Sequence, residues 1–290
     1  MVNHQFVPSP PKRTLWRKPR KIFRVVREPG EIVDRHDFSN LTFIQQINAM
    51  RVAGKRSSIS TQSFRDLVGQ LARRYPQATM GINPKYLRHA LDAGSIEDLA
   101  IEVYGCDPIQ PKVFIDDELF MIALDEAFAR ISDVARNGGN IIFATSRPNA
   151  MLPFMIQLAS LADNAGGNVL DLFSNTSPTI IDGRAGRCLT WCAGVGVVSG
   201  EGSLLSTNDV KIGDDLLFHL SRPDLVVADH IFAGAALTNG YPTVAFTGFE
   251  SLAVAVASVP EQQCTSVPIS LSLPSNHYEI LANNAKSYFK

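Results

Sequence analysis

Short apolar segments alternate with helical segments over more than 150 residues of this chain, and this alternation restricts the fold more than any other feature. The predicted strands cover residues 113–116, 140–145, 168–173, 224–229, 242–247 and 267–273. Runs such as 140–145 are too short for a helix and are typical of strands buried on both faces. Strands that alternate with helices require parallel pairing and crossover connections. The sequence therefore predicts an α/β fold: a flavodoxin-like doubly wound parallel sheet in three α/β/α layers.

The near-neutral total charge hides a strong asymmetry along the chain. Residues 1–90 hold 17 Lys and Arg against 5 Asp and Glu, a net charge of +12, whereas residues 91–290 carry a net charge of −13. Such asymmetry indicates a polyanionic partner for the basic part, or else a solvated basic tail on an acidic domain. We expect three parts: a basic extended arm over 1–35, a helical extension over 36–84 and the α/β domain over 85–290.

The basic arm has the composition of an RNA-binding segment. Eight Lys and Arg residues lie between Lys12 and Arg27, with Trp16 and Phe23 among them and no acidic residue. Several prolines, including Pro19, prevent a continuous helix. The cations fit phosphate groups and the aromatic rings could stack on bases. A targeting presequence is a second interpretation, although the segment is neither amphipathic nor rich in serine.

The extension carries two predicted helices with basic ends. Asn40 can cap a helix over 40–55, and Ser60 or Thr61 can cap a second helix that Pro76 stops. Basic residues gather at the helix ends and either complement the helix dipoles or contact phosphate: Arg51, Lys55, Arg56, Arg73 and Arg74.

Asp229 and His230 stand directly at the end of the predicted strand 224–229, where open α/β sheets bind their ligands. A general acid or base role fits these two residue types. A helix cap by Asp229, with His230 in the first helical turn, explains the same residues and is the interpretation favoured by the sequence.

Other motifs give little support for an active site. The glycines Gly194, Gly196 and Gly200 resemble a dinucleotide loop but lack a preceding strand and a following helix, which indicates a flexible turn. Cys188 and Cys192 have no second ligand pair, so no zinc site is expected. No apolar run reaches the length of a membrane span. We expect no metal, no cofactor and no membrane partner.

From Leu87 to the C-terminus the order of segments resembles that of small-subunit ribosomal protein two, in its mitochondrial form. Residues 87–99 are similar to the helix before the family's first strand, and 113–151 to its first strand, long helix, Gly-Gly turn and next strand. Residues 222–244 resemble its Pro-Asp strand and Ala-rich helix, and 267–289 its last strand and closing helix. The chain departs from the family at 190–195 and 246–249.

This resemblance implies a non-enzymatic structural constituent of the small subunit of the mitochondrial ribosome, near the junction of head and body. The implied partners are small-subunit rRNA and other small-subunit ribosomal proteins, with no small-molecule substrate, and the implied location is the mitochondrial matrix. The expected rRNA-binding residues are Lys12, Arg13, Trp16, Arg17, Lys18, Arg20, Lys21, Arg24, Arg27, Lys55, Arg56, Arg73, Arg74, Arg147, Arg184 and Arg187. The alternative is a flavodoxin-like small-molecule phosphatase or nucleotide-binding enzyme, with Asp229, His230 and the glycines of 194–200 at its cleft.

Overall fold

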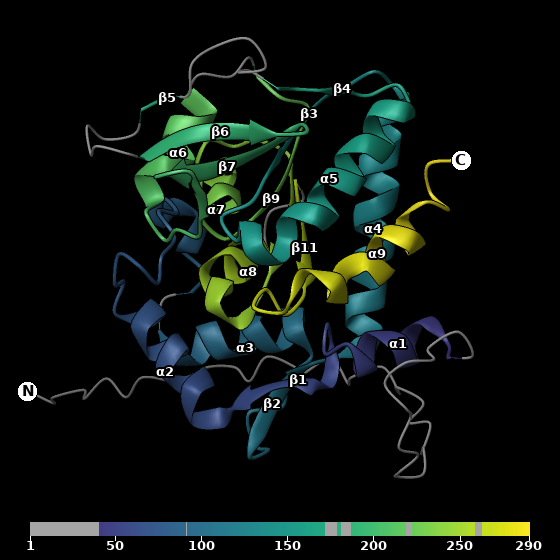
Figure 1. The fold of residues 1–290 in the computed structure, drawn as a ribbon. Helices are drawn as coiled ribbons and strands as arrows, with labels where there is room; N and C mark the ends of the chain where they lie inside the picture. The colour runs from purple at the N-terminus through teal and green to yellow at the C-terminus, as the bar shows by residue number, and fades with distance from the viewer. Residues whose placement is uncertain (1–40, 91, 172–178, 181–186, 219–221, 259–262) are drawn as a thin grey trace, which may run out of the picture. The chain divides into compact units, whose positions relative to one another are not determined.

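The structure is a computed structural model that describes residues 41–90, 92–171, 179–180, 187–218, 222–258 and 263–290 (Figure 1). Residues 41–290 form one unit by their contacts. The predicted basic arm over 1–35 lies outside the described residues. Independent folding of residues 85–290, which the predicted domain boundaries imply, stays a prediction.

The main sheet is built on four parallel strands in the order β11, β10, β9, β3. Their bounds are β3 (Asn140–Ala144), β9 (Leu225–Asp229), β10 (Thr243–Thr247) and β11 (Cys264–Pro268). All five residues of β9 and of β10 are buried, as the continuous apolar runs predict. Phe143 of β3 pairs with Val227 of β9, and Phe246 of β10 pairs with Asp229, so the carboxyl ends of these strands meet at one edge.

An antiparallel part extends the sheet beyond β3. It contains β5 (Thr179–Ile180), β6 (Arg187–Cys192), β7 (Val195–Gly200) and β8 (Ser203–Leu205), while the short β4 (Asn168–Val169) pairs with the first residues of β3. β7 runs parallel to β3 only at Val195 and Gly196, and then continues between its antiparallel neighbours β6 and β8. These antiparallel strands were not predicted from the sequence.

Helices lie on both sides of the strands, which gives the three-layer α/β fold predicted from the sequence (Figure 1). On one side α4 (Asp117–Arg136), α5 (Pro148–Asn164) and α9 (Glu279–Ala285) contact one another in series. On the other side α7 (His230–Thr238) contacts both α6 (Val210–Phe218) and α8 (Leu252–Ser258). Each helix follows a strand or hairpin, as doubly wound connection requires.

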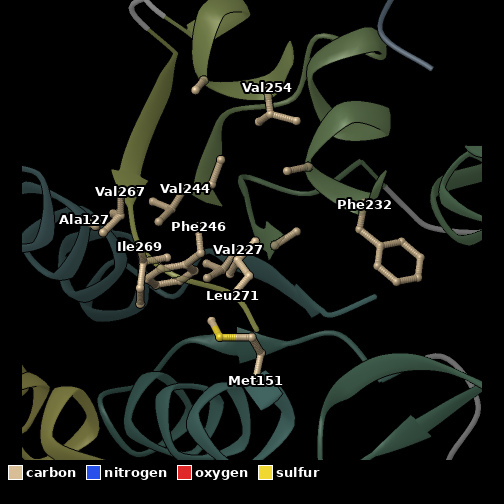
Figure 2. Close-up of a cluster of buried hydrophobic side chains, with 14 of the residues drawn as sticks. Ala127, Met151, Val227, Phe232, Val244, Phe246, Val254, Val267, Ile269 and Leu271 are labelled. Atoms are coloured by element: carbon tan, nitrogen blue, oxygen red, sulfur yellow. The ribbon is translucent and has the colours of Figure 1, made fainter. Parts of the chain in front are cut away.

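The core joins the strands to both helical layers (Figure 2). Val227, Val244, Phe246 and Val267 from three neighbouring strands form a fully buried centre. Met151 of α5 reaches this centre from one layer, while side chains of α7 and α8 lie on the opposite side (Figure 2). The rings of Phe154 and Phe246 meet edge to face with centroids 5.2 Å apart, which locks α5 onto β10.

The first described elements are helices and two strands, and these two strands pair in a second, two-stranded sheet. They are α1 (Phe43–Ala49), β1 (Gly54–Ser60), α2 (Thr61–Ala72), the 3₁₀ turn η1 (Pro84–Leu87), α3 (Ala93–Tyr104) and β2 (Lys112–Ile115). β2 pairs antiparallel with β1, so the prediction that 113–116 joins the parallel sheet was wrong. The alternation of apolar and helical segments predicts that a segment is a strand, but it does not predict which strand that segment pairs with.

Of the element ends predicted from the sequence, the start of α2 is right and others are displaced. Ser60 caps α2 through its side chain, as predicted, and the Asp116 carboxylate accepts hydrogen bonds from the backbone of Glu118 and Leu119 at the start of α4. α1 begins at Phe43 behind a capping box of Thr42 and Gln45, not behind Asn40. The last strand ends at Pro268 rather than at residue 273, and the predicted C-terminal helix is present as η3 (Ser275–Tyr278) and α9. In the part of the chain that is described, no helix has the length and apolar character needed to cross a bilayer.

Candidate functional site

The carboxyl ends of β3 and β9 form the point at which the order of the sheet reverses. From β3 the chain runs through α5 to β4 and the antiparallel strands on one side, and then crosses to β9 on the other side of β3. Open α/β sheets bind ligands at such switch points. Thr145, Ser146 and Arg147 follow β3 here, and Asp229 and His230 end β9 and begin α7.

The Asp229 carboxylate ties the end of β9 to the end of β3. It accepts a hydrogen bond from the Thr145 hydroxyl on one oxygen. On the other oxygen it accepts from the backbone N–H of Ser146 at 2.8 Å and from the Ser146 hydroxyl at 2.9 Å. All three residues are fully buried. Burial raises the pKa of Asp229, while the Thr145 and Ser146 donors and the nearby Arg147 oppose that rise.

Thr145 connects this carboxylate to Arg147. The Thr145 hydroxyl oxygen accepts a hydrogen bond of 3.0 Å from the backbone N–H of Arg147, while the same hydroxyl donates to Asp229. Arg147 is the residue before the first turn of α5, and its carbonyl accepts from the N–H groups of Ala150 and Met151. The backbone of Arg147 is therefore held on both sides.

The Arg147 guanidinium reaches back across the two strand ends to His230. Its Nη2 lies 3.0 Å from His230 Nε2. Burial and the Arg147 charge lower the pKa of His230 to about 3, so the imidazole is neutral near pH 7. Because guanidinium only donates, Nε2 is the acceptor and the imidazole proton lies on Nδ1. His230 Nδ1 is buried and has no hydrogen-bond partner in the structure as described.

His230 also carries backbone strain. Its φ is +45°, in the left-handed region that residues with a Cβ rarely adopt. Such a conformation costs on the order of 1–3 kcal/mol, and an unpaired buried N–H adds about 1–3 kcal/mol. His230 therefore carries two unfavourable contributions to the free energy of folding, and it lies at the edge where open α/β sheets bind ligands.

The geometry corrects the sequence interpretation of this pair. Asp229 precedes α7, but its side chain makes no capping hydrogen bond to that helix, because its carboxylate accepts hydrogen bonds from Thr145 and Ser146 instead. The helix-cap interpretation of Asp229 was therefore wrong, while the position of His230 in the first turn was right. Thr145 and Ser146 were not singled out from the sequence. Their signal is the one that revealed Asp229, namely a polar residue directly after a buried strand.

The glycine and cysteine motifs belong to the β6–β7 hairpin. Ala193 and Gly194 have φ values of +49° and +80° and form the two-residue loop between paired Cys192 and Val195. Gly196 and Gly200 lie inside β7, so these glycines form a tight turn and a strand rather than a phosphate loop or a flexible turn. Cys188 on β6 contacts Ser199 Oγ of β7 at 3.0 Å. Among the described residues, no three His, Cys, Asp or Glu side chains are grouped as metal ligands would be.

The basic residues predicted to contact RNA are dispersed. Arg147 lies at the switch point, while Lys55 and Arg56 are exposed on β1, Arg73 is exposed after α2, and Arg187 is exposed on β6. Arg74 donates to the carbonyl oxygens of Leu87 and Ala90, at 3.1 and 2.5 Å. The remaining members of the set lie outside the described residues: Lys12, Arg13, Trp16, Arg17, Lys18, Arg20, Lys21, Arg24, Arg27 and Arg184.

A surface hollow elsewhere in the fold has no Lys, Arg or His in its lining. It lies between α3, α4, the end of α8 and β11 and is lined by Glu102, Val103, Leu119, Ile122, Ala123, Glu126, Ser258, Cys264, Thr265 and Ser266. Its β11 residues are the first three of that strand, so the hollow lies toward the amino ends of the parallel strands. The switch point at Asp229 remains the better candidate for the site.

Comparison with known proteins agrees with the alternative interpretation of the sequence. The chain is 28% identical over 180 residues to a protein of Streptomyces coelicolor named "Phosphatase SCO2771", and the alignment covers 60% of this chain. The chain spans 64% of the length of that curated relative. The model of a family described as "Phosphatase" matches residues 39–285.

These findings overturn the ribosomal assignment. The matched family and relative are phosphatases, so the resemblance to small-subunit ribosomal protein two, the non-enzymatic role and the rRNA and ribosomal protein partners were wrong, as was the expected absence of a small-molecule substrate. The resemblance had rested on the order of common α/β segments, which unrelated folds of this class share. The mitochondrial location stays an untested prediction. Because the family match covers most of its length, the chain belongs to the Phosphatase family.

Proposed function

We propose that this protein hydrolyses phosphate monoesters at the carboxyl ends of β3 and β9, with the phosphate group held by Arg147 and His230. The observation that carries the proposal is the buried, unpartnered Nδ1 of His230 beside the Arg147 guanidinium. A phosphate oxygen would accept the hydrogen bond that this N–H lacks. The family and the Streptomyces coelicolor relative, both phosphatases by name, support the same reaction class.

Arg147 has the chemistry that phosphate binding needs. A guanidinium carries five N–H donors in a planar fork, and its contact with His230 uses one of them. The fork can donate two parallel hydrogen bonds to a phosphate group. Arg147 is also only partly buried, unlike the carboxylate and hydroxyl groups behind it, so its side chain can meet a ligand from solvent. Its place before α5 adds the positive end of a 17-residue helix.

His230 would act as a neutral hydrogen-bond donor. Its pKa of about 3 keeps the imidazole uncharged near pH 7, so Nδ1–H polarises a phosphoryl oxygen without carrying a positive charge of its own. In hydrolysis the ester P–O bond breaks and a P–O bond to a water oxygen forms, while one proton of that water ends on the departing alcohol. Charge develops on the oxygens around phosphorus during this exchange. Fixed donors aimed at those oxygens supply much of the catalysis in such reactions.

The test is release of inorganic phosphate by the purified full-length protein from p-nitrophenyl phosphate and from a panel of sugar and nucleoside monophosphates. We expect turnover of at least one monoester and a loss of kcat/KM of about 100-fold in Arg147→Ala. Arg187→Ala removes an exposed arginine from β6 and is the matched control, which should keep wild-type activity. Failure to hydrolyse any monoester, or equal activity of the two arginine variants, would contradict the proposal.

Binding of inorganic phosphate gives a second readout that needs no turnover. Isothermal titration of wild-type protein with phosphate should show binding that His230→Ala weakens about tenfold, because the variant lacks the Nδ1 donor. Unchanged phosphate affinity in a folded His230→Ala protein would remove His230 from the proposed site.

A further inference from the structure

Asp229 is unusual, because an acidic side chain is rarely buried completely. Its carboxylate accepts hydrogen bonds from Thr145 and Ser146. Its three donors belong to the two residues that immediately precede Arg147. Both oxygens of Asp229 already accept hydrogen bonds from Thr145 and Ser146, so the carboxylate has no free place for a substrate. Its role must therefore be exerted through other residues.

The contacts form a closed ring around the switch point. The backbone N–H of Arg147 donates to the Thr145 hydroxyl, which donates to Asp229. The Arg147 guanidinium then donates to His230, the residue covalently next to Asp229. Backbone and side chain of Arg147 are thus anchored to two consecutive residues of the β9–α7 junction.

We propose that Asp229 and Thr145 are positioning residues that set the place of Arg147, so that its guanidinium meets the phosphate group and His230 at once. The Thr145 hydroxyl is the central link, since it accepts from Arg147 and donates to Asp229. Ser146 holds the same turn by a separate path, through its own N–H and hydroxyl on the second oxygen of Asp229. This inference rests on the proposed phosphate site.

Asp224, the exposed residue directly before β9, offers a contrast to Asp229. At the amino end of β9 its carboxylate accepts a hydrogen bond of 2.7 Å from the backbone N–H of Asn140, the first residue of β3. Asp224 and Asp229 thus tie the same two strands together at opposite ends. Asp224 is exposed, whereas Asp229 is fully buried, so Asp224→Asn controls for the loss of a carboxylate tie between the two strands away from the site.

The experiment compares Thr145→Val, which keeps the side-chain shape and loses the hydroxyl, with Thr145→Ser, which keeps the hydroxyl. Phosphate affinity by titration and the KM for the best monoester are measured on each full-length variant. We expect Thr145→Val to weaken phosphate binding about tenfold and to raise KM more than it lowers kcat, because it disturbs binding by Arg147. Thr145→Ser and Asp224→Asn should stay within about twofold of wild type.

A double-mutant cycle separates action through Arg147 from general damage. In an Arg147→Ala background, Thr145→Val should cause no further loss of phosphate affinity. An independent further loss of about tenfold, or unchanged affinity in the Thr145→Val single variant, would overturn the inference. Thermal unfolding is recorded for every variant, and Asp229→Asn, which keeps the side-chain volume and loses one acceptor oxygen, replaces Thr145→Val with the same expectations if that variant does not fold.

These measurements separate a failure of the positioning role from a failure of the proposed function. If wild-type protein neither binds phosphate nor hydrolyses any monoester, the proposed function fails and takes the positioning role with it. If wild type is active and Arg147→Ala is impaired while Thr145→Val behaves like wild type, only the positioning role fails.

Discussion

At the scale of single residues, Asp229 and His230 are neighbours whose pKa values burial shifts in opposite directions. Burial raises the pKa of the carboxyl and lowers that of the imidazole, since it disfavours the charged form of each. Hydrogen bonds from Thr145 and Ser146 compensate the Asp229 charge. No such compensation exists for a charged His230, because its nearest partner is the cation Arg147.

The pH dependence of stability should therefore report on His230. The unfolded chain binds a proton at His230 near pH 6.5, but the folded chain does so only near pH 3. Folded protein thus loses stability as the pH falls from 6.5 toward 3. Between pH 7 and pH 5 the free energy of unfolding of wild type should fall by about 2 kcal/mol more than that of His230→Asn, measured by urea denaturation.

Asparagine is the suitable replacement because it tolerates a positive φ better than most residues. The raised pKa of Asp229 acts in the opposite direction, favouring the folded state at low pH, and is common to both proteins. Parallel stability curves for the two proteins would show that His230 is not held neutral in the folded state.

Two residues of this site could be predicted from the sequence, and the others could not. Asp229 and His230 could be placed because parallel strands deliver the residues at their ends to one edge. Thr145 and Asp229 are 84 positions apart, so nothing local in the sequence tells which hydroxyl meets which carboxylate. Arg147 was recognised only as a cation, and its role depends on His230 lying 3.0 Å away.

At the scale of elements, α7 packs unusually close to the segment before η1. A Cβ built on Gly234 of α7 would lie 2.5 Å from the carbonyl oxygen of Met80. In the same region the Thr238 hydroxyl accepts from the Asn83 N–H at 3.1 Å. Gly234 thus allows the helix that begins at the site to lie directly against the backbone of residues 80–83.

Two glycine-to-alanine changes test this packing. Gly234→Ala should destabilise the protein by about 1–3 kcal/mol, because backbone must shift to admit the methyl group. In Gly69→Ala the Cβ meets no atom within 4 Å, and the change should stabilise α2 by about 0.5–1 kcal/mol. Urea unfolding of both variants measures the difference, and a neutral Gly234→Ala would mean that α7 does not lie this close to Met80.

Elements whose pattern is unambiguous could be predicted, and the others could not. Apart from a polar residue at one or both ends, β3, β9 and β10 are apolar, because both of their faces are covered by helices. β7 contains two glycines, and the turn before it places Ala193 at a positive φ, where asparagine or glycine is the usual signal. The sequence therefore suggested a loop where a hairpin stands.

At the scale of the whole molecule, residues 41–84 are joined to the rest by many contacts. The Val52 carbonyl accepts from the Ser270 N–H at 3.0 Å, and Asn48 donates to the Asp117 carboxylate at 2.8 Å. The ring of Phe64 lies edge to face on Phe249, with centroids 6.0 Å apart. Ile47, Val52 and Phe64 are fully buried.

Truncation tests the boundary predicted at residue 84. A 41–290 protein should unfold in one transition, whereas an 85–290 protein should melt at least about 10 °C lower, because it exposes the apolar surface that Ile47, Val52 and Phe64 cover. Circular dichroism during heating checks this. Equal melting temperatures would confirm that residues 85–290 fold on their own.

The 84 positions between Thr145 and Asp229 also have a consequence for how the chain is made. At a synthesis rate of about 5–20 residues per second, roughly 4 to 17 s pass between the emergence of the two residues from the ribosome. During that interval β3 lacks its neighbour β9, so its unpaired backbone edge and its apolar side chains can bind chaperones or other nascent chains. A chain released before residue 229 would therefore be prone to aggregate, and it would never acquire the contacts of Asp229 with Thr145 and Ser146 at the strand ends.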